Sequence, residues 1–282
     1  MTAAAPPQAL PVPRSPAAVV QAPAHWRHVD FIADLHLQAN QSATFAAWQD
    51  YMQNTRANAV FILGDLFEVW VGDDVLDGAA SSPVVTAFET HCAKIIGDAS
   101  RRLAIFFMHG NRDFLLGAAF AKRCGVTLLD DPTVLAFAGQ RWLLSHGDAL
   151  CLDDTDYMAF RAQVRTPQWR QDFLAQPLAR RLEIAHALRA QSELRKRNAV
   201  TCVDLDQQAS CDWLHSAHAS TLIHGHTHKP ATHELPGGLR RIVLSDWDAA
   251  ATPARAEILR LSATQPAIGP SCTEQRVNLI KI

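Results

Sequence analysis

The sequence predicts an α/β fold with a partly antiparallel sheet and a helical insertion. From His28 onward, short apolar runs that each end in a polar cluster alternate with helix-like segments, which is typical of α/β proteins. The turn Ala138-Gly139-Gln140 lies between two apolar runs and predicts a hairpin, so part of the sheet should be antiparallel. Between Cys151 and Leu214 the strand pattern disappears and helical spacing replaces it, which indicates a helical insertion or cap.

Length and composition restrict the class of protein. A chain of 282 residues with 48% hydrophobic content can form one large domain, or a domain with a sizeable insertion. The formal net charge of −2 gives no general reason to expect a nucleic-acid partner. No run approaches the ~18–20 apolar residues that span a bilayer. The six cysteines are scattered without a C-x-x-C pair, so we expect mostly buried free thiols in a reducing compartment.

Residues 1–25 are predicted to form a disordered extension that is rich in Ala and Pro. Repeated proline prevents a continuous helix, and the segment has little apolar mass to bury. The same prolines interrupt the apolar stretch that a signal peptide needs, so we expect a cytoplasmic protein. The core should span residues 26–152 and 201–282, with the cap formed by residues 153–200.

The individual elements follow from the spacing of the apolar residues. The expected strands are Val29–Ala33, Val60–Leu63, Leu103–Met108, Arg141–Leu144, Leu222–Ile223, Ile242–Leu244 and Glu257–Leu261. The expected helices are Thr44–Thr55 and Pro83–Ala99 in the core, and Tyr157–Val164, Pro167–Leu174 and Pro177–Arg197 in the insertion. Proline is acceptable at the start of the last two helices because the first turn needs no backbone donor there.

Polar side chains follow five of the apolar runs, at the point where each run ends. The groups are Asp34-x-His36, Gly64-Asp65, Gly110-Asn111-Arg112-Asp113, Ser145-His146-Gly147-Asp148 and Gly225-His226-Thr227-His228. Residues i and i+2 of an extended strand point to the same face, so Asp34 and His36 should converge on one ion. Ligands of open α/β sheets bind beyond the carboxyl ends of the strands, so we expect all five groups to meet there.

The side chains in these groups favour a pair of divalent cations. Carboxylate, amide and imidazole ligands without thiolate suit Mn²⁺, Fe or Zn²⁺. Seven ligands are too many for one tetrahedral ion and fit two ions ~3.5–4 Å apart with a bridging carboxylate. Such a pair stabilises the attacking and leaving oxygens of a phosphoryl substrate, with activated water as the nucleophile. A lone Asp at a strand end is usually a turn or a helix cap, so the prediction depends on the joint order of the groups.

The order of these groups resembles the calcineurin-like metallophosphoesterases. The segments that carry the resemblance are Phe31–Leu37, Gly64–Asp74, Gly110–Gly117, Ser145–Asp154 and Ile223–Pro230. They are most similar to the family members of the lipid A pathway that act on a UDP-linked diacylglucosamine lipid. The resemblance covers residues 29–247 and implies a sandwich of mixed β-sheets flanked by helices, with a helical cap.

The resemblance also implies roles for the polar side chains. One Mn²⁺ would take Asp34, His36 and His228, the second would take Asn111, His146 and His226, and Asp65 would bridge the two ions. The residues implied in catalysis are Asp65, Asn111, Arg112 and His146. Many relatives have histidine where this chain has Arg112, whose fork of donors suits a diphosphate. The alternative for Arg112 is a plain surface ion pair. His224 is expected to be structural.

Substrate contacts are expected in the cap and around the two metal ions. Asp154 and Tyr157 lie one turn apart, next to the His146 loop, while Arg189, Ser192 and Lys196 recur on one helix face. The resemblance matches Asp154 and Ser192 of the cap to substrate contacts. The full set expected to bind substrate is Asn111, Arg112, Asp154, Tyr157, Arg189, Ser192, Lys196 and His226. The alternative for the helix face is a solvated cationic helix.

The insertion also carries apolar and cationic groups that suit a lipid. Trp169, Phe173, Leu174 and Leu178 could form the wall of an acyl-chain cleft, or they could pack the cap onto the body. Five arginines add positive charge that could rest on an anionic membrane surface, and these are Arg161, Arg165, Arg170, Arg180 and Arg181. We therefore expect peripheral association with the cytoplasmic face of the inner membrane.

The activity that the resemblance implies is Mn²⁺-dependent hydrolysis of the diphosphate bond. Water would attack the α-phosphorus of the UDP-linked lipid and release UMP and 2,3-diacylglucosamine 1-phosphate. Two alternatives stay open at this point. The same site could serve a nucleotide pyrophosphatase or a phosphoprotein phosphatase, or the fold could be a non-catalytic scaffold.

Overall fold

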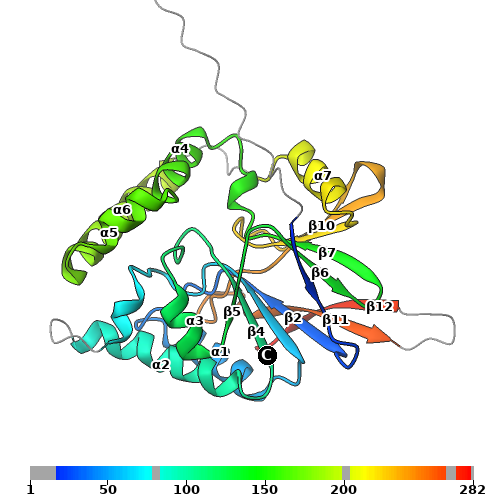
Figure 1. The fold of residues 1–282 in the computed structure, drawn as a ribbon, viewed down its shortest axis with the longest axis horizontal. Helices are drawn as coiled ribbons and strands as arrows, with labels where there is room; N and C mark the ends of the chain where they lie inside the picture. Colours follow the sequence, from blue (N-terminus) through cyan, green and yellow to red (C-terminus); the bar gives the residue numbers. More distant parts are fainter. Residues whose placement is uncertain (1–16, 78–82, 199–203, 265–270, 281–282) are drawn as a thin grey trace, which may run out of the picture.

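The protein is an α/β sandwich with a helical arm, described here by a computed structural model (Figure 1). The structure describes residues 17–77, 83–198, 204–264 and 271–280, without the side chains of residues 83–86 and 191–198. The helices are α1 (Ser42–Asn54), α2 (Pro83–Ala99), α3 (Ala118–Cys124), α4 (Thr155–Val164), α5 (Pro167–Leu174), α6 (Leu178–Asn198) and α7 (Gln207–Ser216).

The described strands form two six-stranded sheets. The first has the order β1-β6-β7-β8-β10-β9, with the bounds β1 (Ala18–Gln21), β6 (Thr133–Phe137), β7 (Gln140–Leu144), β8 (Thr221–His224), β10 (Leu239–Val243) and β9 (Ala231–Leu235). The second has the order β12-β11-β2-β3-β4-β5, with the bounds β12 (Ser271–Asn278), β11 (Glu257–Thr264), β2 (His28–Ile32), β3 (Ala59–Leu63), β4 (Ala104–Met108) and β5 (Thr127–Leu129). Both sheets mix parallel and antiparallel pairs, as expected from the sequence.

Three apolar layers hold the sheets and helices together. Between the two sheets, Phe31 and Phe61 of the second sheet pack with Trp142 of the first. On the outer face of the second sheet, alternate strand residues such as Ile62 pack under α1, α2 and α3. A third cluster lies between the first sheet and α7, which contributes Leu214. The central strands are buried on both faces, which is why they appear in the sequence as unbroken apolar runs.

The hairpin predicted at Ala138-Gly139 is confirmed. Strands β6 and β7 pair antiparallel, and the two turn residues have φ of 51° and 75°. Positive φ at both central residues matches the right-handed twist of the flanking strands, which is the geometry of a type I′ turn. The hairpin places the end of β7, and with it His146, beside the end of β8.

The predicted disorder of residues 1–25 is wrong for its last part. Residues Ala18–Gln21 form β1, which pairs in parallel with β6, while residues 1–16 lie outside the described residues. The β-branched pair Val19 and Val20 suits an edge strand, and the prolines of this segment lie on either side of the strand. Tertiary pairing with β6 therefore outweighs the composition of the segment.

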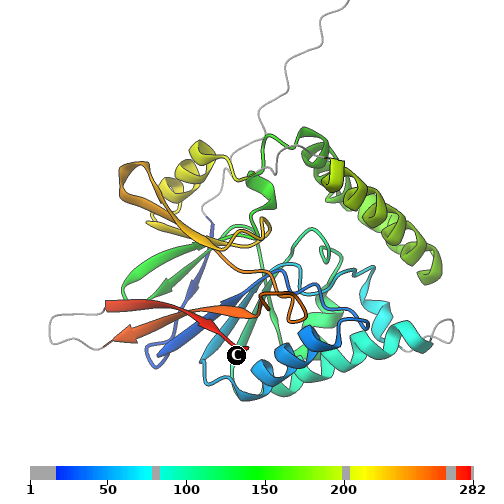
Figure 2. The ribbon, with the colours of Figure 1, turned by 180° about the vertical axis from the view of Figure 1, so that it is seen from behind.

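The helical cap consists of α4, α5 and α6, which lie together as an arm on one side of the sandwich (Figures 1 and 2). The arm packs on the body through apolar side chains of α5 and α6, including Phe173, which is buried in the same cluster as α1 and α2. The three helices predicted between Cys151 and Leu214 are present, and α7, which was not predicted, follows them.

Candidate metal centre

The seven side chains expected to bind metal lie in loops that follow five strands. Asp34 and His36 follow β2, Asp65 follows β3 and Asn111 follows β4, all in the second sheet. His146 follows β7, and His226 and His228 follow β8, in the first sheet. The loops of the two sheets face each other, and backbone bonds join neighbouring loops, such as His36 N to Asp65 O at 3.0 Å.

Asp34 and His36 are brought together by the conformation of the loop backbone, and not by the alternation of side chains along a strand. Strand β2 ends at Ile32, and both residues have a left-handed backbone with φ of 54° and 49°. The expectation that they share one face of an extended strand is therefore wrong. Of the seven described non-glycine residues with positive φ, five belong to the expected ligand set, namely Asp34, His36, Asp65, His226 and His228.

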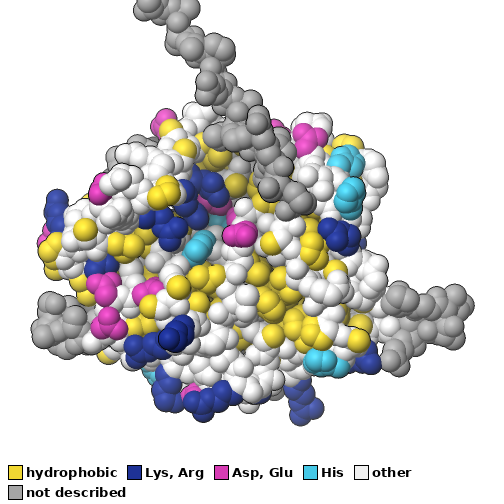
Figure 3. All heavy atoms as spheres, in the orientation of Figure 1, with side chains coloured by type: hydrophobic (Ala, Val, Ile, Leu, Met, Phe, Trp, Pro, Cys, Tyr) yellow, Lys and Arg dark blue, Asp and Glu magenta, His cyan; other side chains and the backbone are white. Residues whose placement is uncertain are grey.

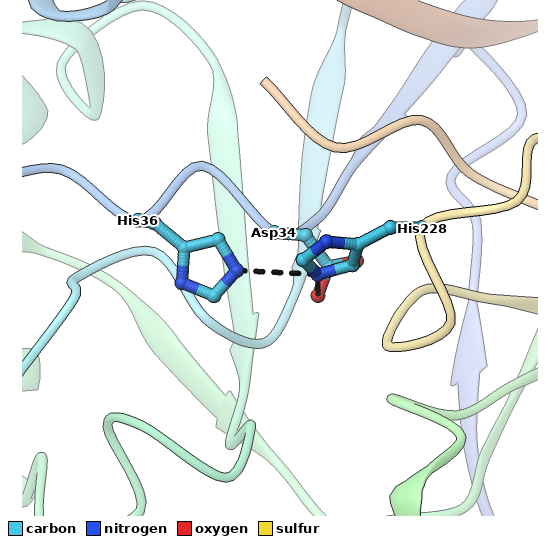
Figure 4. Close-up of side chains that lie close together, drawn as sticks. All are labelled: Asp34, His36 and His228. Carbon is cyan, nitrogen blue, oxygen red and sulfur yellow. Dashed lines mark hydrogen bonds and ion pairs between the residues drawn. The ribbon is translucent and has the colours of Figure 1, made fainter. Parts of the chain in front are cut away.

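Asp34, His36 and His228 form one group of converging ligand atoms (Figure 4). The Nε2 atoms of His36 and His228 lie 3.3 Å apart, and Nε2 of His228 lies 3.3 Å from Oδ1 of Asp34. Oδ1 of Asp34 is buried and has no hydrogen-bond partner among the described residues. Two imidazole nitrogens and an unbonded carboxylate oxygen aimed at one point fit a divalent cation.

Asn111, His146 and His226 form a second group. The Oδ1 atom of Asn111 lies 3.1 Å from Nε2 of His146 and 3.0 Å from Nδ1 of His226. His146 is completely buried. This group offers one amide oxygen and two imidazole nitrogens, which also fit a divalent cation.

Asp65 lies between the two groups. Its Oδ2 atom is 3.9 Å from Nε2 of His36, and its Oδ1 atom is 3.8 Å from Nε2 of His146. Ligand atoms of Asp34, Asp65 and His146 also lie within 4.8 Å of one another. One carboxylate oxygen therefore faces each group, which is the arrangement that a bridging ligand requires.

The three histidines that turn Nε2 toward the centre have an oxygen near Nδ1. Nδ1 of His146 donates to the backbone oxygen of Leu63 at 2.8 Å. Nδ1 of His36 lies 3.1 Å from Glu68, and Nδ1 of His228 lies 3.9 Å from Asp246. A proton held at Nδ1 leaves the Nε2 lone pair available for a metal ion, and the hydrogen bond to Leu63 favours this tautomer for His146.

Asp113 holds two of the ligand loops together and was not assigned a role from the sequence. Its buried carboxylate accepts backbone bonds from Gly110 at 2.9 Å and from Leu66 at 2.7 Å. A Cβ atom at Gly110 would lie 2.0 Å from Oδ1 of Asp65, so only glycine fits there. The G-N-R-D group therefore combines the expected ligand Asn111 with Gly110 and Asp113, which allow the Asp65 loop to lie close to it.

Burial and neighbouring charges act in opposite directions on the histidines. Burial disfavours the charged form of His146, but Asp65 and Asp34 outweigh it and raise the pKa of this side chain to about 9. Burial lowers the pKa of His36 and of His226 to about 4. Asp34 and Asp65 thus place negative charge at the centre, where it favours a positive charge, which is the protonated His146 in the absence of metal. His36 and His226 stay neutral beside it.

The start of the cap is joined to the centre by a buried ionic cluster around Asp148. Its Oδ2 atom accepts bonds from the Tyr157 hydroxyl at 2.5 Å and from Nε of Arg161 at 2.8 Å, and Arg165 lies 3.7 Å away. The Tyr157 ring lies 5.9 Å from the ring of His226. Asp154 caps α4 by accepting from the Tyr157 backbone at 3.1 Å. Asp148 belongs to the motif Ser145-His146-Gly147-Asp148, but its contacts with the cap were not predicted from the sequence.

The cationic surface predicted for the cap is therefore smaller than expected. Arg161 and Arg165 contact Asp148, and Arg181 is buried and pairs with Asp74. These three guanidinium groups bind the cap to the body and do not form a surface for lipid. Figure 3 shows Lys and Arg side chains gathered between the cap and the body, next to a His side chain.

The remaining cap predictions have mixed outcomes. Arg189 reaches Glu68 beside the centre, whereas the side chains of Ser192 and Lys196 lie outside the described residues. The apolar side chains mostly pack the cap onto the body, as the alternative interpretation required. Trp169 stacks on Phe173 with a ring separation of 4.8 Å, and Leu178 packs against the core, whereas Leu174 is 40% exposed.

His224 lies next to the ligand loops without facing the centre. It is fully buried, and its Nδ1 atom lies 2.8 Å from the backbone oxygen of Gly225. Burial lowers its pKa to about 3, so the ring is neutral. Its placement agrees with a structural role.

Among the described helices, none is both long enough and apolar enough to cross a membrane.

The family model for the calcineurin-like phosphoesterases matches residues 27–230, which is more than half of the chain. The chain belongs to this family. The match includes every loop of the candidate metal centre, so this phosphoesterase is a metal-dependent hydrolase that uses divalent metal. Its sandwich of mixed sheets flanked by helices is the fold that the resemblance implied.

Relatives of this calcineurin-like phosphoesterase carry a more specific name. The UDP-2,3-diacylglucosamine hydrolase of Chromobacterium violaceum is 45% identical over 228 residues, which cover 78% of this chain and 90% of the relative. A hydrolase of the same name from Cellvibrio japonicus is 44% identical and covers 77% of this chain and 90% of the relative. One from Chromohalobacter salexigens is 43% identical and covers 77% of this chain and 87% of the relative. The chain belongs to the same family as these hydrolases.

Proposed function

We propose that this phosphoesterase hydrolyses UDP-2,3-diacylglucosamine to UMP and 2,3-diacylglucosamine 1-phosphate in lipid A biosynthesis, with two Mn²⁺ ions. The relatives that share its family supply the substrate. The observation that carries the chemistry is the position of Asp65, which turns one oxygen toward each of two groups of ligand atoms. A carboxylate between two such groups is what a pair of ions requires.

Each ion would be held by residues of both sheets. Asp34, His36 and His228 would hold one ion and Asn111, His146 and His226 would hold the other, with Asp65 shared. Oxygen and imidazole ligands suit Mn²⁺, and the absence of thiolate from this set disfavours a structural zinc site. When bound, the ions supply the Lewis acidity that activates water and neutralises charge on the phosphoryl group.

Arg112 is suited to a diphosphate more than to a simple phosphate ester. Its backbone nitrogen donates to Oδ1 of Asp65 at 2.8 Å, so its side chain starts at the edge of the centre. A guanidinium stabilises negative charge on phosphoryl oxygens but cannot give up a proton at neutral pH. Attack at the α-phosphorus expels a phosphate, whose second pKa is about 6, so this leaving group needs no proton. An alkoxide leaving group would need one.

The cap supplies the remaining substrate contacts. Asn111, Arg112 and His226 would meet the diphosphate, while Asp154, Tyr157, Arg189, Ser192 and Lys196 would contact the nucleotide or sugar. The Tyr157 hydroxyl is bonded to Asp148, so its ring is the part turned toward His226. The exposed Leu174 and the partly buried Trp169 remain candidates for acyl-chain contacts.

Peripheral membrane association is also part of the proposal. The lipid substrate resides in a membrane, and Leu174 of the cap and Leu152, just before the cap, are exposed to solvent. Two further cations of the cap could meet anionic lipid headgroups, namely the half-buried Arg170 and the exposed Arg180, which also pairs with Glu183. Sedimentation with anionic vesicles, but not with neutral vesicles, would support this association on the cytoplasmic face of the inner membrane.

The test of the activity is release of UMP from UDP-2,3-diacylglucosamine. Protein stripped of metal with a chelator should be inactive, and added Mn²⁺ should restore turnover. Soluble nucleotide diphosphates and a phosphopeptide serve as competing substrates, because the metal centre alone could serve a pyrophosphatase or a phosphatase. Turnover of a soluble substrate as fast as the lipid, or activity that does not depend on metal, would contradict the proposal.

A further inference from the structure

Glu68 is a buried carboxylate next to the metal centre that the proposed mechanism leaves without a role. It lies three residues after Asp65 and is 6% exposed. Its backbone nitrogen donates to the oxygen of Leu37 at 3.2 Å, and a bridge between Leu37 and Phe67 continues the pairing of the two loops. The backbone of Glu68 is therefore held beside the loop that carries His36, which precedes Leu37.

The two oxygens of Glu68 face different partners. Oε2 lies 3.1 Å from Nδ1 of His36, on the side of the ring opposite Nε2, which faces His228. Oε1 contacts Nε of Arg189, which is 29% exposed and lies on α6 of the cap. One carboxylate thus contacts a metal ligand of the body and a cation of the cap.

A carboxylate on the outer nitrogen of a metal-binding histidine fixes the ring and its tautomer, and it increases the basicity of the inner nitrogen. Glu68 is placed to do this for His36. Because the same carboxylate pairs with Arg189, any change in the position or charge of His36 changes the interaction that holds this part of α6. Another ionic contact of α6 with the body, Arg181 with Asp74, lies near the start of the helix and does not touch a proposed ligand.

We propose that Glu68 is a positioning residue that orients His36 for metal and couples metal binding to the position of cap helix α6 through Arg189. The inference depends on the divalent-metal centre of the proposed function. Coupling of this kind is reciprocal, so metal should stabilise α6 against the body and Arg189 should transmit that effect.

The test measures metal binding and helix protection without substrate. Full-length protein stripped of metal is titrated with MnCl₂ by calorimetry, and hydrogen exchange is followed at the backbone amides of residues 182–190 of α6. Glu68→Gln should weaken one of the two Mn²⁺ sites by roughly 10–100-fold. In the wild type, Mn²⁺ should slow exchange in residues 182–190, and in Glu68→Gln this slowing should be lost.

Arg189→Gln separates the two parts of the inference. It should retain Mn²⁺ affinity within about threefold, because Glu68 still contacts His36, but it should lose the slowing of exchange in α6. This variant also tests the coupling if Glu68→Gln does not fold. Glu183→Gln is the matched control, because it removes a carboxylate that pairs with Arg180 on the exposed face of the same helix. It should behave as the wild type in both measurements.

The outcomes distinguish this inference from the proposed function. Wild-type affinity in Glu68→Gln, or exchange in wild-type α6 that is unaffected by Mn²⁺, would overturn the role of Glu68 while leaving the metal centre intact. Absence of Mn²⁺ binding to the wild-type protein would instead contradict the proposed function itself.

Discussion

The proposed ligands have an unusual backbone conformation. Asp34, Asp65 and His226 have φ of 54°, 52° and 67°, in a region where a non-glycine residue costs ~1–3 kcal/mol. Asp and His tolerate this region better than β-branched residues do, but five such residues in one centre need support from elsewhere. Asp113 and the backbone bonds between loops provide part of that support. Bound cations would provide the rest.

The residue types of the centre could be predicted from the sequence, but their geometry could not. The order of the motifs selected seven side chains that the structure brings together. The prediction that Asp34 and His36 use strand alternation was wrong, because no residue pattern shows that β2 ends at Ile32 and that the loop turns left-handed. Glu68 was missed for a similar reason, since its partners are distant in sequence.

Asp65→Ala should abolish turnover while the fold survives. The side chain faces both ligand groups and contributes nothing to the apolar core, so its loss removes a ligand from each ion. We expect kcat/KM to fall by at least about 10³-fold, which corresponds to roughly 4 kcal/mol. UMP release and circular dichroism of the same sample provide the measurement. Turnover near that of the wild type would refute the bridging role.

Arg112→Ala should chiefly reduce kcat. A guanidinium that stabilises charge in the transition state contributes roughly 10²–10³-fold, and KM should change less. The backbone bond from residue 112 to Asp65 does not depend on the side chain, so the metal sites should remain. Arg112→Lys is the control, because it keeps the charge and loses the fork of donors. A rise in KM at constant kcat would show that Arg112 only binds substrate.

The loops and helices around the centre are held by carboxylates that bond to backbone or arginine. Asp73 accepts from Gly117 and Phe120, both at 2.9 Å, and so ties the loop after β3 to the start of α3. Asp148 does the same for α4 through Arg161. The long helices and central strands were predictable from their apolar spacing. The attachments were not, because they join motifs that are far apart in the chain.

The edge elements show why local pattern was not sufficient. Strand β1 was predicted to be disordered because its neighbours are Ala and Pro, yet it pairs with β6 over four residues. An edge strand needs only a short β-branched segment and one partner, and composition averaged over 25 residues hides it. The arginines of the cap were assigned to a lipid surface because the buried Asp148, which pairs with Arg161, and the exposed Asp74, which pairs with the buried Arg181, could not be matched to them from the sequence.

Arg161→Met should destabilise the protein much more than Arg180→Met. Arg161 compensates Asp148, whose side chain is fully buried, whereas Arg180 pairs with Glu183 on the surface. Removing one partner of a buried ion pair costs about 3–5 kcal/mol, and an exposed pair contributes less than about 1 kcal/mol. Urea unfolding of both variants is the measurement. Equal free energies of unfolding would mean that Asp148 does not depend on Arg161.

At the scale of the whole molecule, the centre lies where the loops of the two sheets meet. Asp34, His36, Asp65 and Asn111 come from the second sheet, and His146, His226 and His228 come from the first. Each proposed ion therefore has ligands from both sheets. Metal binding would crosslink the two halves of the sandwich as well as supply chemistry.

Removal of metal should therefore lower the thermal stability of the protein. A ligand that binds only the folded state at a concentration 100 times its Kd stabilises it by about 2.7 kcal/mol. For a chain of 282 residues this shifts the Tm by several degrees. Calorimetric scans with excess Mn²⁺ and with a chelator give the difference in Tm. Asp65→Ala should show little difference between the two scans. Identical scans for the wild type would argue against metal that links the sheets.

The central claim is that seven side chains from two facing sheets hold a pair of divalent cations, with Asp65 between them. Anomalous diffraction from crystals of the protein grown with Mn²⁺ tests it most directly. We predict two manganese peaks ~3.5–4 Å apart, one beside Asp34, His36 and His228 and the other beside Asn111, His146 and His226. A single peak, or peaks away from Asp65, would contradict the claim.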